Sequence, residues 1–238
     1  MFSLSFVTVA LALVGASASN ASPLEPRACP PYEIITARGT SAAQGDTTGY
    51  TGMLNQALAS LPGSTHYDVV YPASLDFYNS IQAGARDLGA HIRNGITFCP
   101  NQKYALIGYS QGAEVINTYL QDVTPSNNAN IYNQIKAVVH IGNPSHSPYN
   151  PSNYDENGGR TTDPYSGGGI AGFKTQPLTA YIYSGKLRDI CYNYDTICAF
   201  TEPKPSGPAQ SGNHFAYNGS ASVQSQGANH IVSKLTAA

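Results

Sequence analysis

One pentapeptide of the form G-x-S-x-G, Gly108-Tyr109-Ser110-Gln111-Gly112, constrains the fold of this chain more than any other feature. The apolar pair Leu106 and Ile107 precedes it, and an apolar stripe at helical spacing, residues 115–120, follows it. This order predicts a strand, a sharp turn that carries Ser110, and a helix. The flanking glycines let strand and helix approach where a Cβ would clash. A serine hydroxyl held out on such a turn is suited to act as a nucleophile.

The same pentapeptide could also arise in an ordinary loop, because the chain has 23 glycines and many serines. The buried strand before it and the helical stripe after it favour the nucleophile interpretation. Gln111 would then begin the helix, so its N–H has no partner within the helix. An N–H donor in that position, aided by the helix dipole, favours a developing oxyanion.

Strand-like and helix-like patterns alternate along the rest of the chain. Strands are predicted over residues 32–37, 67–71, 103–109, 135–142 and 178–184, and helices over residues 53–61, 80–96, 111–120 and 220–235. The alternation predicts an α/β fold with a parallel sheet covered on both faces. Ligands meet such a sheet at the carboxyl ends of its strands, where Thr40, Ser110 and the loop after residue 142 would gather. That loop, residues 143–173, is long for a compact domain, which is typical of a functional or mobile segment.

A serine nucleophile needs a histidine base, and the chain has six histidines. His214 follows a loop rich in Pro, Gly and Ser and precedes the last predicted helix. In this fold class the chain order is serine, acid, histidine, so His214 is the best candidate. His146 in the long loop stays open, and His230 within the final helix is a weaker choice. The three other histidines lie in or directly before predicted elements, where a structural role is the simpler interpretation.

The acid should follow a late strand and precede His214, and both Asp189 and Asp195 satisfy this condition. Spacing alone does not decide between them. In either case the carboxylate would set the imidazole tautomer and stabilise the imidazolium. Glu114 is close to Ser110 in sequence but is expected to point along the helix, so we interpret it as incidental.

Four cysteines are typical of a protein of an oxidising compartment. Three pairings are possible, and the short spacing of Cys191 and Cys198 favours a local bridge, which would leave Cys29 to pair with Cys99. No metal and no cofactor are expected, because there is no C-x-x-C and no histidine at ligand spacing.

The N-terminal segment has the pattern of a secretory signal. Residues 6–14 are apolar but too few to span a bilayer, and Ala16-Ser17-Ala18 offers a small-residue cleavage site. The pattern predicts a signal peptide over residues 1–18, a leader or loose tail over residues 19–27 and one mature domain over residues 28–238. We expect a secreted, extracellular protein without stable membrane anchoring. Asn20 and Asn218 begin glycosylation sequons.

Charge argues against several classes of partner. The formal net charge is −2, the pI is about 6.3 and only 11% of residues are charged. Neither nucleic acid nor an anionic membrane surface is expected as a partner. Weak charge with 17 tyrosines fits a neutral or apolar substrate. We expect a monomer.

The chain resembles the fungal cutinases, and more closely the cutinase-like esterases, over essentially the whole mature region. The matching segments are Ala28-Cys29-Pro30, Ala37-Arg38-Gly39-Thr40 with Gln44-Gly45, Gly108-Tyr109-Ser110-Gln111-Gly112, Ile141-Gly142-Asn143-Pro144 with His146, the cysteine-flanked stretch 189–198, and His214-Phe215-Ala216-Tyr217. The pentapeptide together with the cysteine-flanked aspartate and the histidine segment is a specific combination.

The resemblance implies a small α/β-hydrolase, a three-layer sandwich with a central, mostly parallel five-stranded sheet and no large lid. It implies a triad of Ser110, His214 and Asp195, because the family's D-x-x-C pattern selects Asp195 over Asp189. It also implies that Thr40 partners the N–H of Gln111 in the oxyanion hole.

The resemblance further implies disulfides between Cys29 and Cys99 and between Cys191 and Cys198. Two departures stand out. The family usually has glycine immediately before the triad aspartate, where this chain has Tyr194. The long segment 143–173 is like the cutinase-like branch and unlike the shortest cutinases.

The function that the resemblance implies is that of a secreted serine carboxylester hydrolase. Its expected substrates are cutin-type polyesters and short-to-medium acyl esters, cleaved through an acyl-enzyme. Acetylxylan esterase, a related family with the same triad, is the alternative, although that family often carries extra cysteines. A non-catalytic wall-binding protein on a hydrolase scaffold is a third interpretation, disfavoured because all three triad residue types are present.

Overall fold

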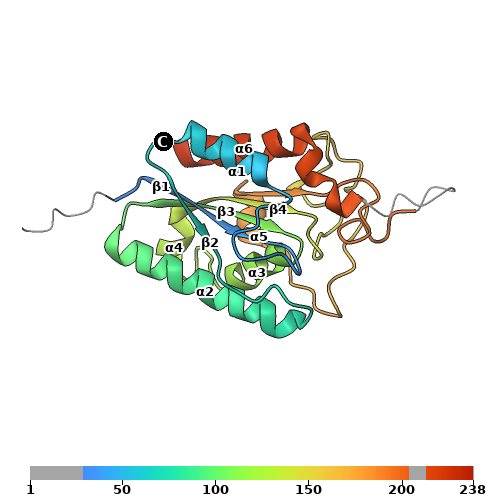
Figure 1. The fold of residues 1–238 in the computed structure, drawn as a ribbon, viewed down its shortest axis with the longest axis horizontal. Helices are drawn as coiled ribbons and strands as arrows, with labels where there is room; N and C mark the ends of the chain where they lie inside the picture. The colour runs from blue at the N-terminus through green and yellow to red at the C-terminus, as the bar shows by residue number, and fades with distance from the viewer. Residues whose placement is uncertain (1–28, 204–212, 238) are drawn as a thin grey trace, which may run out of the picture.

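The computed structural model of this 238-residue chain describes residues 29–203 and 213–237. The predicted signal peptide, the leader and Asn20 lie outside the described residues. A sheet lies between two helical layers, with α1 and α6 on one side and α2, α3 and α4 on the other (Figure 1). The predicted three-layer α/β architecture is confirmed.

Within the described residues, six strands form one sheet in the order β2-β1-β3-β4-β6-β5, and every pairing between them is parallel. The strands are β1 (Tyr32–Ala37), β2 (Thr65–Asp68), β3 (Lys103–Tyr109), β4 (Ile135–Ile141), β5 (Asn153–Tyr154) and β6 (Leu187–Ile190). The prediction of five strands is therefore one short. The additional strand, β5, has two residues inside the long loop, too few to give a hydrophobic period.

The prediction of a strand over residues 178–184 is wrong. This stretch forms the helix α5 (Thr179–Tyr183), and the strand follows it as β6. Aromatic and β-branched residues suggested a strand. However, Leu178, Tyr181 and Ile182 are the buried positions, at the i, i+3, i+4 spacing of a helix. The burial of one helical stripe outweighs the local strand preference.

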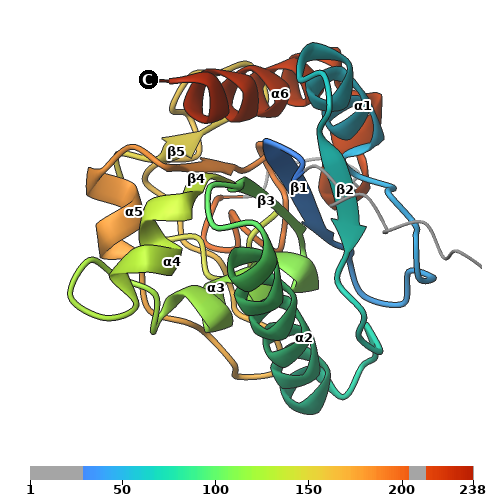
Figure 2. The same ribbon diagram turned by 90° about the vertical axis from the view of Figure 1, so that its left-hand side faces the viewer.

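The remaining helices divide between the two faces of the sheet (Figure 2). They are α1 (Thr51–Ser60), α2 (Phe77–Phe98), α3 (Gln111–Leu120), α4 (Ala129–Gln134) and α6 (Ala221–Thr236), with the short 3₁₀ helices η1 (Asn213–Phe215) and η2 (Tyr217–Gly219). Side chains of α2, α3 and α5 share one apolar core, and those of α1 and α6 share the other. Strands β1, β3 and β4 are buried almost throughout, as expected of parallel strands covered on both faces.

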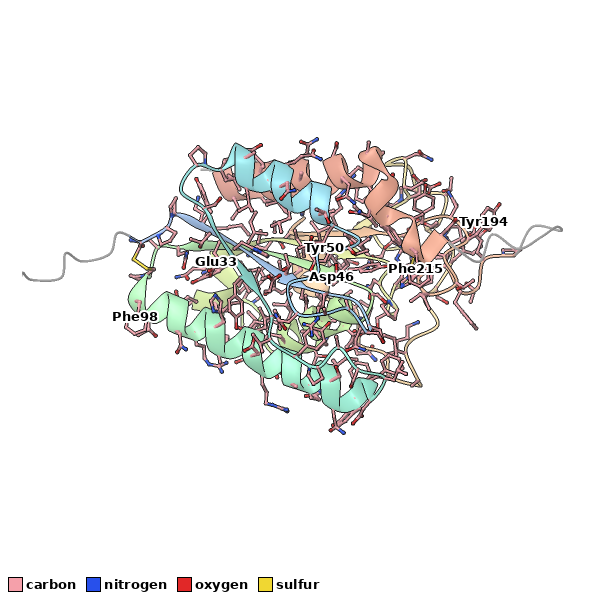
Figure 3. The ribbon with its side chains drawn as sticks, in the orientation of Figure 1. Glu33, Asp46, Tyr50, Phe98, Tyr194 and Phe215 are labelled. Carbon is pink, nitrogen blue, oxygen red and sulfur yellow. A yellow bond between two sulfur atoms is a disulfide. The ribbon has the colours of Figure 1, made fainter. Side chains whose placement is uncertain are left out.

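The carboxyl ends of four strands lie level with one another. Ala37 of β1 is in register with Gly108, Tyr109 of β3 with Ile141, and Ile141 of β4 with Ile190 of β6. The loops that follow these strands therefore start along one edge of the sheet. Figure 3 places Phe215 and Tyr194 at one end of the molecule and Phe98 at the other.

Two disulfides have the pairing that the resemblance implies. Cys29–Cys99 joins the start of the domain to the residue after α2, across a separation of 70 residues. Cys191–Cys198 closes a short loop directly after β6, across 7 residues. Among the described residues, no helix is both long and apolar enough to cross a membrane.

Candidate active site

Ser110 lies on a sharp turn between β3 and α3, as its motif predicts. Its φ of 54° and ψ of −118° are rarely adopted by a residue with a side chain. The glycines on either side allow this turn. A Cβ on Gly112 would lie 2.0 Å from the carbonyl oxygen of Ala37, and one on Gly108 would lie 2.7 Å from the Cα of Ala113. The turn can therefore close only without side chains at these two positions.

His214 and Asp195 meet Ser110 at this turn. His214 Nε2 is 2.9 Å from Ser110 Oγ, and His214 Nδ1 is 2.9 Å from Asp195 Oδ2. Ser110 and His214 are each 8% exposed, whereas Asp195 is fully buried. Gly142, directly after β4, lies against the imidazole, since a Cβ there would be 2.8 Å from His214 Cε1. The geometry is that of a nucleophile, a base and an acid that orients the base.

Asp195 lies in the loop that the Cys191–Cys198 bridge closes, and two further donors hold its carboxylate. Its Oδ1 accepts from the N–H of Ile197 at 2.8 Å, and its Oδ2 accepts from the hydroxyl of Tyr217 at 2.5 Å. The preceding residue, Tyr194, has a φ of 62°. Tyrosine therefore adopts here the left-handed backbone conformation that favours glycine, and the departure seen in the sequence does not displace the aspartate.

Two tyrosines hold the imidazole, and sequence reasoning did not assign them this role. The ring of Tyr109 stacks on His214 at a centroid distance of 5.4 Å, and its hydroxyl donates to the carbonyl of His214 at 2.6 Å. The ring of Tyr217 meets the imidazole edge-on at 6.3 Å. Burial raises the pKa of both phenols, so both remain hydrogen-bond donors near neutral pH. The sequence signal for this role was that Tyr109 lies in the pentapeptide around Ser110 and Tyr217 lies in the segment that begins with His214.

Gln111 joins the turn to two neighbouring segments. Its fully buried side chain donates to Thr40 Oγ1 at 3.2 Å and to the carbonyl of Ser74 at 2.9 Å. Its Oε1 accepts from the hydroxyl of Ser80 at 2.7 Å. Since Thr40 Oγ1 accepts from this amide, the Thr40 hydroxyl proton is free to point elsewhere. Gln111 is also the first residue of α3, so its backbone N–H has no partner within the helix.

Arg38 shapes the turn that carries Thr40. It is only 6% exposed. Its guanidinium donates to the carbonyl of Ala42 at 2.8 Å, to Gln44 Oε1 at 2.9 Å and to the carbonyl of Tyr71 at 2.5 Å. It also lies 4.6 Å from the centre of the Tyr71 ring. The sequence showed Arg38 in a segment that resembles the family, but neither its burial nor its partners.

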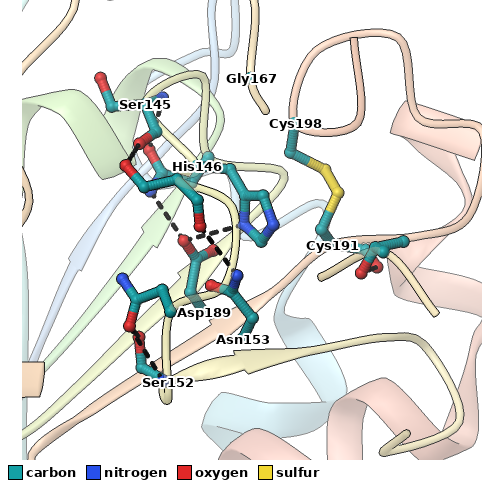
Figure 4. Close-up of polar contacts among 12 residues, drawn as sticks. Ser145, His146, Ser152, Asn153, Gly167, Asp189, Cys191 and Cys198 are labelled. Atoms are coloured by element: carbon teal, nitrogen blue, oxygen red, sulfur yellow. Dashed lines mark hydrogen bonds and ion pairs between the residues drawn. A yellow bond between two sulfur atoms is a disulfide. The ribbon is translucent and has the colours of Figure 1, made fainter. Parts of the chain in front are cut away.

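Figure 4 shows a second histidine–aspartate pair, His146 and Asp189. His146 Nδ1 is 3.1 Å from Asp189 Oδ2, and both side chains are buried. Burial by itself would raise the pKa of Asp189, but His146 and the amide of Asn143 outweigh it and hold that pKa below its usual range. Asp195 rather than Asp189 faces His214. Among residues 29–203 and 213–237, no three His, Cys, Asp or Glu side chains are grouped to hold a metal ion.

Glu114 makes no hydrogen bond to His214, but it has a structural role that the sequence did not suggest. Glu114 is fully buried in the first turn of α3. Its carboxylate accepts from the hydroxyls of Ser145 and Thr175, the latter at 2.9 Å, and the N–H of Thr175 donates to Ser145 Oγ at 2.9 Å. Burial raises the pKa of Glu114 despite these donors. The carboxylate thus ties the helix after Ser110 to both ends of the long loop.

The family of the chain follows from a direct match. The family model described as Cutinase matches residues 28–235. The chain belongs to the cutinase family. It is similar to a solved structure titled a novel cutinase-like protein from Cryptococcus sp., with a TM-score of 0.76 and 34% identity over 89% of this chain and 98% of that one.

Curated relatives of this cutinase-family chain carry esterase names. Carboxylesterase Culp1 of Mycobacterium tuberculosis is 30% identical over 195 residues, 81% of this chain and 79% of the relative. An acetylxylan esterase of Hypocrea jecorina is 28% identical over 169 residues, 60% of this chain and 56% of the relative. The catalytic core of an acetyl xylan esterase from Trichoderma reesei shares the fold, with a TM-score of 0.67, 23% identity and 87% of this chain covered against all of that one. The chain is an ester hydrolase with an α/β-hydrolase fold.

Proposed function

We propose that this ester hydrolase uses Ser110 as its nucleophile, His214 as its general base and acid, and Asp195 to orient the imidazole. The observation that carries the proposal is the 2.9 Å distance between Ser110 Oγ and His214 Nε2, with Asp195 on the opposite ring nitrogen. A hydrogen bond to the carboxylate at Nδ1 keeps the proton there. Nε2 is then free to accept the serine proton.

The reaction would proceed through an acyl-enzyme. Ser110 Oγ bonds to the ester carbonyl carbon while its proton moves to His214 Nε2. The bond between that carbon and the alcohol oxygen then breaks, and the alcohol takes the proton from Nε2. Water repeats both steps, which releases the carboxylic acid and restores the serine.

The negative charge on the carbonyl oxygen would be met by two donors beside Ser110. One is the N–H of Gln111 at the start of α3, and the other is the hydroxyl of Thr40. The Gln111 side chain supports this assignment because it donates to Thr40 Oγ1 at 3.2 Å and leaves the hydroxyl proton to the substrate. A donor fixed in advance needs no rearrangement when charge develops.

Cutin-type polyesters and short-to-medium acyl esters are the substrates we propose. Phe215 next to His214, Leu75 next to Ser74, and Phe200 after the Cys191–Cys198 loop are 79%, 72% and 63% exposed, respectively. Such side chains suit an apolar acyl chain or polymer surface better than a hydrated polysaccharide. Acetylated xylan remains the competing substrate because of the acetylxylan esterase relatives.

Ser110→Ala tests the nucleophile. The variant should lose p-nitrophenyl butyrate hydrolysis by about 10⁴-fold or more, because the remaining groups provide no covalent step. A serine-directed organophosphate should add one adduct to the wild type, located at Ser110 by peptide mass, and none to the variant. Full activity of Ser110→Ala would overturn the proposal.

The substrate proposal is tested separately, by comparing p-nitrophenyl butyrate, solid polyester film and acetylated xylan at equal enzyme concentration. We expect release of acid from the butyrate ester and the polyester to exceed release of acetate from xylan. The reverse order would assign the chain to xylan deacetylation while leaving the serine mechanism intact.

We also propose that the protein is secreted as a monomer, with residues 1–18 as a signal peptide, 19–27 as a leader and 28–238 as the mature domain. The two disulfides fit an oxidising compartment. Asn218 of the second sequon is exposed in η2. N-terminal sequencing and the mass of the protein from culture medium test cleavage, and light scattering tests the monomer.

A further inference from the structure

Asp195 accepts one hydrogen bond that the proposed mechanism does not require. It comes from Tyr217, which is fully buried and whose hydroxyl oxygen is 2.5 Å from Asp195 Oδ2. The same hydroxyl oxygen accepts from the N–H of Tyr192 at 3.0 Å. The backbone N–H can only donate, and the carboxylate oxygen is a nearer and stronger acceptor than the disulfide sulfur of Cys198 at 3.4 Å, so the hydroxyl proton of Tyr217 points to the carboxylate.

The carboxylate of Asp195 is therefore held at both oxygens before it meets the imidazole. Oδ1 accepts from Ile197 N at 2.8 Å, Oδ2 accepts from Tyr217, and His214 Nδ1 lies 3.0 and 2.9 Å from the two oxygens. Two fixed donors set the plane of the carboxylate. They also take up negative charge that would otherwise act on the imidazolium.

We propose that Tyr217 is a positioning residue that weakens the pull of Asp195 on the His214 imidazolium, so that His214 stays an unprotonated base in more acidic solution. The inference rests on the proposed triad and deepens it. A hydrogen bond to a carboxylate stabilises the anion and spreads its charge. The anion then stabilises a neighbouring cation less.

The surroundings of His214 allow this effect to be isolated. Among the described residues, the titratable groups that face it are Asp195, Tyr109 above its ring and Tyr217 at its edge, with Tyr192 behind Tyr217 at a ring distance of 5.7 Å. Burial raises the pKa of Tyr109 and of Tyr217, so neither changes charge in the range where an imidazole titrates. A change at the Tyr217 hydroxyl should therefore reach His214 through Asp195.

Tyr217→Phe removes the donor and keeps the ring. We expect the acidic limb of the kcat/KM profile to move to higher pH by about half a unit to one unit, because the unshielded carboxylate stabilises the imidazolium more strongly. Above that limb kcat/KM should fall less than about tenfold. The ring proton signals of His214, followed by NMR in the resting enzyme, should titrate at the same raised pH.

Tyr181→Phe is the matched control, because it also removes a buried hydroxyl, one without a hydrogen-bond partner among the described residues. It should leave the acidic limb unchanged. An unmoved limb in Tyr217→Phe, or one moved to lower pH, would show that Tyr217 only fills space and would overturn the inference.

A second variant covers the case in which Tyr217→Phe does not fold. 3-Fluorotyrosine at position 217 keeps the packing and makes the phenol a stronger donor, so the acidic limb should move to lower pH. No movement, or movement to higher pH, overturns the inference. The NMR titration does not depend on catalysis, so the two proposals can fail separately. If Ser110→Ala is inactive but the His214 titration does not move in Tyr217→Phe, only the inference about Tyr217 fails. If Ser110→Ala is active, the triad fails whatever the titration shows.

Discussion

The two histidine–aspartate pairs of this molecule have nearly the same geometry and different surroundings. His214 Nδ1 is 2.9 Å from Asp195, and His146 Nδ1 is 3.1 Å from Asp189. Nε2 of His214 faces Ser110 Oγ, whereas Nε2 of His146 is buried without a partner in the described part of the chain. A buried carboxylate against an imidazole is therefore not a site in itself. It becomes one where the second ring nitrogen reaches a nucleophile.

The difference follows from where each aspartate lies. Asp189 is inside β6, paired in register with His140 of β4, so its side chain is enclosed by the sheet and the long loop. Asp195 lies beyond the strand, in the loop closed by Cys191–Cys198, and reaches the carboxyl edge where Ser110 is held. We therefore propose that the inner pair, His146 and Asp189, contributes to structure and that the outer pair, His214 and Asp195, takes part in catalysis.

The largest expected effect separates the two pairs by activity. His214→Ala should lower kcat by about 10⁴-fold or more because Ser110 loses its base. His146→Ala should leave kcat/KM of the folded enzyme within about threefold but lower the free energy of unfolding by about 3–5 kcal/mol, since it leaves Asp189 buried and unpaired. Initial rates and urea unfolding measure both. A stable but inactive His146→Ala would contradict the comparison.

An effect of intermediate size is expected on the stability of the protein in acid, and it comes from His140, which is in register with Asp189 of the inner pair. Burial lowers the pKa of His140 to about 4 from 6.5, so the folded protein keeps this ring neutral while the unfolded chain protonates it below pH 6.5. The free energy of unfolding should therefore fall as pH drops from 6.5 to 4, by roughly 3 kcal/mol from this group. His140→Leu should show a smaller drop in urea unfolding between pH 7 and 4.5. Equal drops would argue against this role.

The smallest expected effect concerns the outer loop. Tyr194→Gly removes the backbone strain of a tyrosine in the left-handed conformation, but glycine makes the unfolded chain more flexible. We therefore expect the free energy of unfolding to change by less than about 1 kcal/mol and kcat/KM to stay within about twofold. Gly142→Ala is the matched change at another left-handed position, but its Cβ would press on His214 and should lower kcat/KM markedly. Similar kcat/KM values for the two variants would show that the contact between the new Cβ and His214 does not affect activity.

Much of the site formed by Ser110, His214 and Asp195 could be predicted from the sequence because its motifs are short and continuous in the chain. The turn at Ser110 needs glycine where strand and helix touch, and those glycines are two residues away on either side. The chain order of serine, acid and histidine, with the family resemblance, pointed to Asp195 and His214, although spacing alone left Asp189 open. The structural role of Glu114 could not be predicted because its partners, Ser145 and Thr175, are 31 and 61 residues away.

Patterns between neighbours along the chain were enough to predict most of the alternation of strands and helices, the strained serine turn and the cysteines available for bridging. Spacing along the chain left Asp189 and Asp195 both open, and the folded structure shows that Asp195 meets His214. Nothing in the chain order indicated that Tyr217 donates to that carboxylate or that residues 179–183 are a helix. These outcomes depend on strand register and on which surfaces are buried together. Such contacts join residues as far apart as the 104 positions between Ser110 and His214, and no local pattern records them.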